Sequence, residues 1–179
     1  MRVLRWADYR RMKWKNGGGE TAEIAAFPEG AGMDDFGWRL SMATVAVDGP
    51  FSAFAGIDRT LTIIEGNGIE LAVGDAAPVR LTTASLPHSF PGDLPAFARL
   101  IDGPVLDLNV MTRRGRFSHT VERVAAPAET EASAVVCLTG TAMVEGRTLG
   151  PRDSGVDLTD TVRIDGTGEI LAVGIMRED

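Results

Sequence analysis

The feature that most constrains this chain is the regular interruption of short apolar runs by turn-forming residues. Runs rich in Val, Ile, Leu, Thr and aromatic residues are separated by Gly, Pro, Asn or Asp at intervals of about ten residues. No window keeps the apolar period of an amphipathic helix for more than about one turn. This spacing predicts an all-β protein, built as a sandwich or barrel.

The expected strands fall into two series. The first comprises 2–6, 20–27, 37–47, 59–65, 69–73, 79–83, 96–101 and 104–111, and the second comprises 117–124, 133–139, 141–145, 156–159, 161–165 and 168–176. The segment "EGNGIEL" (65–71) predicts a tight hairpin, because Asn-Gly supplies the positive φ angles of a type I′ turn. The segments "RTLTIIEGNGIELAVG" and "AVVCLTGTAMVEGRTLG" resemble each other, which indicates a weak internal repeat.

Duplicated β units of this length predict two jelly-roll barrels packed together, an architecture that hides the sheet edges. The small, acidic connection "AAPAETEAS" (125–133) is the best internal boundary. Residues 1–124 are therefore expected to form a barrel that carries the ligand pocket. Residues 125–179 are expected to form a smaller half, with N-terminal strands available to complete it.

Composition limits the classes of partner. The net charge is -7, although residues 1–15 carry six Lys and Arg against Asp8 alone. The acidic remainder argues against nucleic-acid binding, and the basic start is expected mainly to pair with acidic surface, or else to present cations to a small anion. No apolar run suits a membrane helix, and the N-terminus lacks a signal-peptide pattern. The single cysteine, Cys137, excludes an intramolecular disulfide and favours a cytoplasmic protein.

Two otherwise apolar segments carry polar pairs at alternate positions. Arg39 and Ser41 share one face of a strand, and Asp107 and Asn109 share one face of another. Such groups need partners or a wet cavity if both faces of the sheet are covered. Mutual neutralisation inside the protein, or exposure on a half-solvated face, are the simpler interpretations. Arg59, in "GIDRTL", together with Lys15 and Asn16 strengthens the interpretation as a pocket.

Other chemistry is sparse. His88 and His119 are far apart in sequence and lack the spacing of metal ligands, so no metal or other cofactor is expected. Cys137 lies in an apolar run that is typical of a core thiol. The glycines of "NGGGET" lack the GxxxxGK[ST] spacing of a phosphate loop, and they predict a turn that feeds the next strand.

The strings "WKNGGGET", "WRLSMA", "GIDRTL" and "DLNVM.RRG" resemble the HutD/Ves family, closely over about residues 5–120 and more loosely beyond. The resemblance implies a bicupin, with two RmlC-like cupin barrels in one chain. It also implies a role in histidine utilisation or, in the Ves branch, in a stress response. Members in the histidine context are thought to bind a small pathway metabolite and to limit flux or expression.

Our leading hypothesis is a metal-free regulatory bicupin that binds a carboxylate-bearing metabolite, such as urocanate or formylglutamate. Arg39 and Arg59 are expected to clamp the carboxylate, because the guanidinium fork matches its geometry. Other residues are expected to add a point charge, hydrogen bonds, orientation or a basic rim: Lys15, Asn16, Ser41, Asp107, Asn109 and Arg113.

The alternative is a metal-independent isomerase or hydrolase that uses Asp58, Asp107 or Glu65 as acid–base groups. An enzyme should project a free carboxylate into the pocket, whereas a binding protein should satisfy it with Arg or Asn. A third hypothesis is an interaction protein whose barrels are filled by side chains. The apolar run "EILAVGIM" suits either the core or a homodimer.

Overall fold

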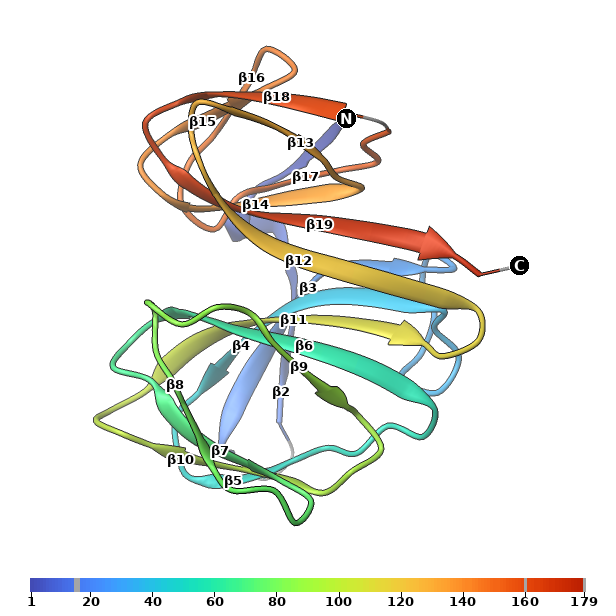
Figure 1. Ribbon diagram of the computed structural model, residues 1–179, viewed down its shortest axis with the longest axis vertical. Helices are drawn as coiled ribbons and strands as arrows, with labels where there is room; N and C mark the ends of the chain where they lie inside the picture. Colours follow the sequence, from blue (N-terminus) through green and yellow to red (C-terminus); the bar gives the residue numbers. More distant parts are fainter. Residues whose placement is uncertain (15–16, 160, 179) are drawn as a thin grey trace. The chain divides into compact units, whose positions relative to one another are not determined.

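The computed structural model describes residues 1–14, 17–159 and 161–178, and β-structure dominates them (Figure 1). The helical content of these residues is one short 3-10 turn, η1 (Trp6–Asp8). Across these ranges, no helix has the length and apolar character needed to span a membrane. The all-β class predicted from the sequence is confirmed.

The strands group into two compact units. The smaller unit combines Met1–Tyr9 with His119–Arg177, and the larger unit consists of Arg10–Ser118 and Glu178. The first nine residues therefore belong with the C-terminal strands. Strands pair antiparallel in both units, as β4 and β6 do with β11 and as β17 and β19 do with β14.

The larger unit contains two sheets. Its six-stranded sheet has the order β2 (Arg10–Lys13), β3 (Gly19–Phe27), β4 (Trp38–Val45), β11 (Val105–Arg113), β6 (Ile57–Glu65) and β9 (His88–Pro91). Its four-stranded sheet has the order β5 (Gly49–Phe51), β10 (Ala96–Leu100), β7 (Ile69–Val73) and β8 (Val79–Leu81).

The smaller unit also contains two sheets. Its five-stranded sheet has the order β1 (Arg2–Leu4), β17 (Ser154–Val156), β14 (Ala134–Thr139), β19 (Glu169–Arg177) and β12 (Phe117–Ala125). Its four-stranded sheet has the order β13 (Ala128–Glu131), β18 (Thr161–Gly166), β15 (Ala142–Val144) and β16 (Arg147–Leu149).

The two units repeat one pairing pattern. The order β5-β10-β7-β8 recurs as β13-β18-β15-β16, and β4-β11-β6-β9 recurs as β12-β19-β14-β17. Each strand in the second set lies eight positions later than its counterpart in the first. The similar segments 59–74 and 134–150 supply equivalent strands, since they contain β6 with β7 and β14 with β15. The internal repeat predicted from the sequence is therefore a structural repeat.

The hairpin predicted at residues 65–71 is wrong. Strand β6 ends at Glu65 in the six-stranded sheet, whereas β7 starts at Ile69 in the four-stranded sheet, so the connection crosses between sheets. Gly68 has a φ of +107°, and a Cβ there would lie 2.2 Å from the carbonyl oxygen of Leu81. The turn thus needs glycine for close backbone approach as well as for its φ angle.

Several short strands have no clear sequence signal: β2, β5, β9, β13 and β16. Strand β13 lies inside the segment 125–133 that was expected to be a connection. Strand β17 ends at Val156, where a strand over 156–159 was expected to begin. These strands have three or four residues each, so pairing with neighbours defines them more than their local pattern does.

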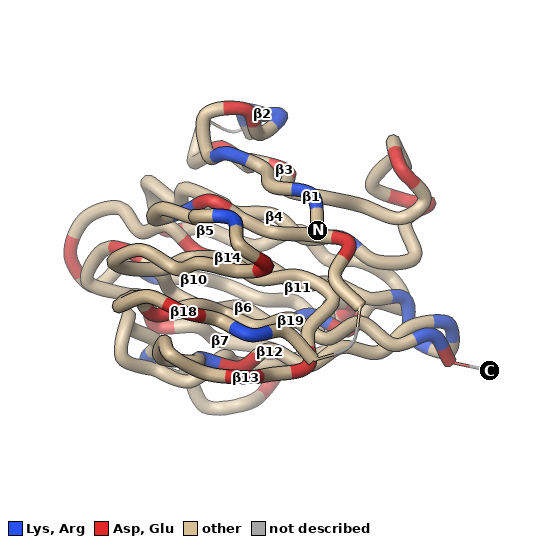
Figure 2. The backbone as a smooth tube through the Cα atoms, turned by 90° about the horizontal axis from the view of Figure 1, so that it is seen from above, with Lys and Arg blue, Asp and Glu red and all other residues tan. Residues whose placement is uncertain are grey.

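The basic N-terminal segment is neutralised by acidic partners. Arg2 pairs with Asp157 at 3.0 Å, and Arg11 pairs with Glu20 at 3.0 Å across β2 and β3. Figure 2 shows basic and acidic residues interspersed along the backbone. The sequence-based interpretation that the basic start pairs with acidic surface is confirmed at these positions.

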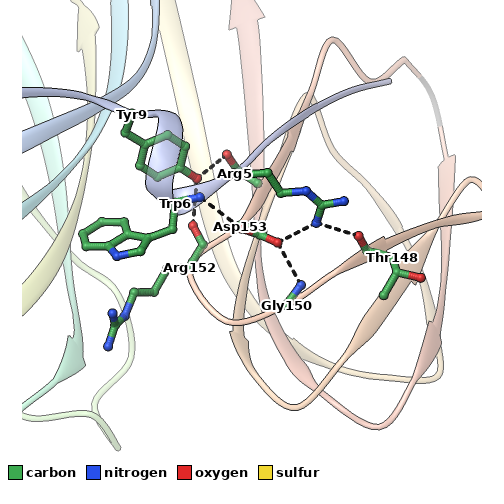
Figure 3. Close-up of polar contacts among 8 residues, drawn as sticks. Arg5, Trp6, Tyr9, Thr148, Gly150, Arg152 and Asp153 are labelled. Carbon is green, nitrogen blue, oxygen red and sulfur yellow. Dashed lines mark hydrogen bonds and ion pairs between the residues drawn. The ribbon is translucent and has the colours of Figure 1, made fainter.

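A polar cluster fastens the start of the chain within the smaller unit (Figure 3). Asp153 accepts hydrogen bonds from Arg5 Nη1 at 2.6 Å and from the Trp6 amide at 3.0 Å. The Tyr9 hydroxyl lies 2.7 Å from Ser154 Oγ and donates to the carbonyl of Arg152 at 2.8 Å. Burial raises the pKa of Tyr9, so its phenol stays protonated and this cluster is structural.

Candidate functional site

The inward face of the six-stranded sheet carries the polar residues singled out in the sequence. The register places Arg39 opposite Met111 and Ser41 opposite Asn109 between β4 and β11. On the other side of β11, Met111 lies opposite Arg59 of β6. Because side chains alternate along a strand, these residues project from one face. Arg39, Ser41, Arg59 and Asn109 are all buried.

A cavity of about 550 Å³ opens against this face within the larger unit. Four of the residues predicted for the site lie in its wall: Arg39, Ser41, Arg59 and Asn109. The rest of the wall is mainly apolar, and it comprises Met12, Lys13, Trp14, Thr21, Met33, Ala43, Pro50, Phe51, Ser52, Phe54 and Met111. The cavity therefore combines a basic, polar wall with an apolar surround.

Arg59 is held from three sides. Its guanidinium carbon lies 4.7 Å from the ring centroid of Phe51 and 5.4 Å from that of Phe90. Its Nε donates to Asn109 Oδ1 at 2.7 Å. The two terminal nitrogens donate to no residue that the structure describes, which leaves the end of the guanidinium fork available to a ligand. A carboxylate matches that end with two parallel hydrogen bonds.

Arg39 is 3% exposed and is only partly satisfied. Its Nε donates to Glu23 Oε2 at 2.8 Å, and its Nη1 donates to Ser41 Oγ at 3.2 Å. Its Nη2 is buried without a hydrogen-bond partner among the described residues. An unpaired buried donor is costly, so an acceptor supplied by a ligand would be stabilising here.

Asp107 lies behind the cavity wall and contributes no atom to it. Its side chain is fully buried, and Oδ1 accepts a hydrogen bond from Asn109 Nδ2. Oδ2 is buried with no partner in the described structure. Asn109 thus connects Asp107 to Arg59, because its amide donates to the carboxylate and its carbonyl accepts from the guanidinium.

Burial governs the ionisation of Asp107 and Arg59. It raises the pKa of Asp107 to about 7, although Arg59 and the Asn109 hydrogen bond act in the opposite direction. Burial also lowers the pKa of Arg59 to about 10, assisted by Arg39 and opposed by Asp107. Arg59 is therefore cationic at neutral pH, whereas Asp107 titrates near neutral pH.

The other predicted site residues are placed elsewhere. Arg113 donates to the carbonyls of Phe36 at 3.0 Å and Asp34 at 2.9 Å, so it fixes the loop before β4 and does not line the cavity. Lys15 and Asn16 lie outside the described residues.

The proposed acid–base carboxylates do not converge on the cavity. Asp58 pairs with Arg114 at 2.6 Å on the surface, and Glu65 is the last residue of β6. Among the described lining residues, none is Asp or Glu. Two other carboxyl groups of this sheet accept hydrogen bonds from wall residues, Glu23 from Arg39 and Asp107 from Asn109.

Sequence reasoning missed the partners that complete the site. Glu23 neutralises Arg39, and Phe51 and Phe90 enclose Arg59. Thr21 accepts from Trp14 Nε1 at 2.8 Å, which fixes the indole at the cavity wall. The alternation of Thr21 and Glu23 within "ETAEIAAF" was the available signal for β3, whereas the aromatic residues gave none.

The lining residues do not fit a metal ion. Guanidinium groups have no lone pair to give a metal, and the cavity wall contains neither His nor Cys among its described members. Throughout the described ranges, no group of three or more His, Cys, Asp or Glu could hold a metal ion. Cys137 is a buried free thiol in the other unit.

Comparison with known sequences gives consistent matches. The HutD family model matches residues 6–173. A Pseudomonas putida protein, described as an uncharacterized 21.2 kDa protein in the hutC 3′ region, is 33% identical over 177 residues, covering 98% of this chain and 92% of that protein. Protein Ves of Citrobacter koseri is 40% identical over 117 residues, covering 63% of this chain and 60% of Ves.

Comparison with solved structures gives the same picture. HutD from Pseudomonas fluorescens SBW25, whose structure is described with a formate condition, has a TM-score of 0.86 and 32% identity, with 99% of both chains covered. An oxalate decarboxylase of Lactobacillus farciminis, in a formate complex, has a TM-score of 0.65 at 8% identity and covers 98% of this chain and 88% of its own. The latter likeness concerns the fold alone, which is cupin-like.

Proposed function

The chain belongs to the HutD family, and from that premise we propose that it is a metal-free bicupin that binds a small carboxylate-bearing metabolite. The two sets of eight strands with one pairing order support the assignment of two jelly-roll barrels. The cavity in the larger unit is the binding site.

One observation carries the assignment of a carboxylate ligand. Arg59 is fixed by Asn109 and two aromatic rings while its terminal nitrogens are left unpaired by the described residues. Arg39 contributes one more buried donor without a partner. Donors that are oriented before binding recognise a carboxylate at low entropic cost.

The biological setting that we propose is a regulatory role in histidine catabolism, with urocanate or formylglutamate as ligand. The P. putida relative is described by its place in the hutC 3′ region, and the P. fluorescens HutD structure by a formate condition. A cytoplasmic location belongs to the same proposal, and a homodimer remains a prediction.

An acid–base enzyme is the second candidate, because the pKa of Asp107 is raised to about 7. A general base must reach the proton that it abstracts. Asp107 is fully buried behind Asn109 and does not line the cavity, so we favour binding over catalysis.

Thermal shift measurements with urocanate and formylglutamate test the proposal. A ligand at 100 times its Kd adds about 2.7 kcal/mol to stability, and this should raise Tm by roughly 5–10 °C in a chain of this size. The double variant Arg39→Ala, Arg59→Ala should fold and lose the shift. Addition of EDTA should leave the shift of the unmodified chain unchanged.

The matched control is Arg99→Ala, which removes an exposed arginine of the same unit that lies outside the cavity wall. This variant should keep the full shift. The assignment of the ligand is wrong if the double variant is stabilised as much as the control. Arg59→Lys separates charge from geometry, and it should keep only a fraction of the shift because an ammonium lacks the fork.

A further inference from the structure

The charged groups at the site balance one another in a specific way. Two guanidinium groups, Arg39 and Arg59, lie with two carboxyl groups, Glu23 and Asp107. Glu23 is bound directly to Arg39 at 2.8 Å. The group is therefore neutral when Asp107 is ionised, and it carries one positive charge when Asp107 is protonated.

Asp107 is poorly stabilised as an anion. It is fully buried, and a single hydrogen bond from Asn109 serves one of its oxygens, while the other oxygen has no partner among the described residues. A buried carboxylate normally needs a direct charge partner or several donors. Arg59 reaches Asp107 only through Asn109, because its Nε is committed to the Asn109 carbonyl.

We propose that ligand binding at this site is coupled to proton uptake, so that the carboxylate of the ligand replaces that of Asp107 as the single negative charge facing Arg59. This inference rests on the proposed function, since it concerns regulation of the same cavity. A bound anion on the free end of Arg59 would face an ionised Asp107 on the other side of one guanidinium. Like charges in a dry interior are unfavourable, so protonation of Asp107 accompanies binding.

The neighbouring elements supply few other groups that titrate near neutrality. Ala43 of β4 and Ile63 of β6 lie directly opposite Asp107, and β5, β7, β8 and β10 give the shared core apolar residues such as Phe51, Leu71, Leu81 and Ala98. Lys13 lies at the exposed part of the cavity wall. His88 of β9 stacks on Phe90 with ring centroids 6.0 Å apart, and it is the group that must be controlled for.

Sodium formate is a suitable probe, because its charge does not change over the pH range used. Its affinity is measured by calorimetry from about pH 5.5 to about pH 8.5 in buffers of different ionisation enthalpy. We expect a nearly constant Kd below about pH 7 and a loss of up to about tenfold per pH unit above it. The buffer series should accordingly show proton uptake that rises from near zero well below pH 7 to about one proton per formate bound above it.

Two variants identify the residue that takes up the proton when formate binds. Asp107→Asn keeps an oxygen that can accept from Asn109 but cannot ionise, so formate affinity should become independent of pH. His88→Gln should retain the pH dependence of the unmodified chain. Because proton uptake is also measured on the unmodified chain, the inference can be tested even if Asp107→Asn fails to fold.

The outcomes distinguish a failure of the proposed binding function from a failure of the proposed proton coupling. Absence of formate, urocanate and formylglutamate binding at every pH would overturn the binding function itself. Binding without proton uptake would overturn only the coupling. A pH dependence that survives in Asp107→Asn and disappears in His88→Gln would also overturn it, by assigning the proton to the histidine.

Discussion

At the scale of single residues, the surroundings of Asp107 determine its pKa more than its residue type does. Burial raises its pKa to about 7, while Arg59 and Asn109 only partly offset the cost of removing a carboxylate from water. Glu23 is also a carboxylate on the same sheet, but it contacts Arg39 directly. The same functional group therefore contacts an arginine directly in one place and is buried without a direct arginine contact in the other, where it titrates near neutrality.

This difference predicts a pH dependence of stability. Between about pH 4, where an unfolded Asp loses its proton, and about pH 7, the native state retains a proton at Asp107 that the unfolded chain has released. Stability therefore falls as pH rises through this window, by up to about 1.4 kcal/mol per pH unit. In Asp107→Asn this contribution is absent, so urea unfolding should show the variant gaining stability relative to the parent as pH rises.

Asp75→Asn is the control for this measurement, because Asp75 is exposed in the turn after β7. Its unfolding free energy should follow that of the parent at every pH. Parallel profiles for the parent and Asp107→Asn would contradict the assignment of the titration to Asp107.

At the scale of elements, the connections determine the architecture as much as the strands do. The turn between β6 and β7 takes the chain from one sheet to the other, and its counterpart between β14 and β15 does the same in the smaller unit. In the first turn, Gly68 packs against the backbone of Leu81. Asn-Gly predicts that the chain turns here, but only the tertiary pairing decides which sheet the next strand joins.

Two glycines of the larger unit test whether the β6–β7 turn depends on close backbone packing at Gly68. Gly68→Ala introduces a Cβ 2.2 Å from a backbone oxygen at a φ of +107°, whereas Gly56→Ala meets nothing within 4 Å at a φ of +68°. We expect a cost of roughly 1 kcal/mol for Gly56→Ala, from left-handed backbone alone. The cost for Gly68→Ala should be about 3 kcal/mol or more, because backbone must also move. Equal urea midpoints for the two variants would contradict the role of close packing.

At the scale of the whole molecule, one pairing pattern supports two kinds of interior. The smaller unit has an apolar core that includes Val135, Cys137, Ile170 and Ala172 on β14 and β19. The equivalent strands of the larger unit, β6 and β11, carry Arg59, Asp107 and Asn109 among their inward residues. Repetition of the fold therefore does not repeat the site, which is consistent with function being set by side chains.

Hydrogen exchange distinguishes the two interiors. A saturating concentration of urocanate or formylglutamate should slow amide exchange in β4, β6 and β11, since a ligand stabilises the state that binds it. Amides of β14 and β19 should exchange at nearly unchanged rates. Equal protection in both units would indicate that the ligand acts on the whole chain and not on the cavity alone.

The sequence alone determined the β class, most of the long strands and the grouping of polar residues by face. Arg39 with Ser41 and Asp107 with Asn109 could be grouped because strand side chains alternate with a period of two, which is a local property. The positions of glycine-containing turns and the internal repeat could also be predicted from the sequence, because they too are local properties of the chain.

Only the tertiary structure decided which strands pair and which polar residues are thereby brought together. The pairing of β11 with both β4 and β6 brings Arg39 and Arg59 to opposite sides of Met111, and no local pattern specifies that register. The aromatic rings around Arg59, the Glu23 counterion and the burial of Asp107 depend on the same long-range pairings. Residues far apart in sequence acquire their ionisation and their binding geometry only when the sheets close around them.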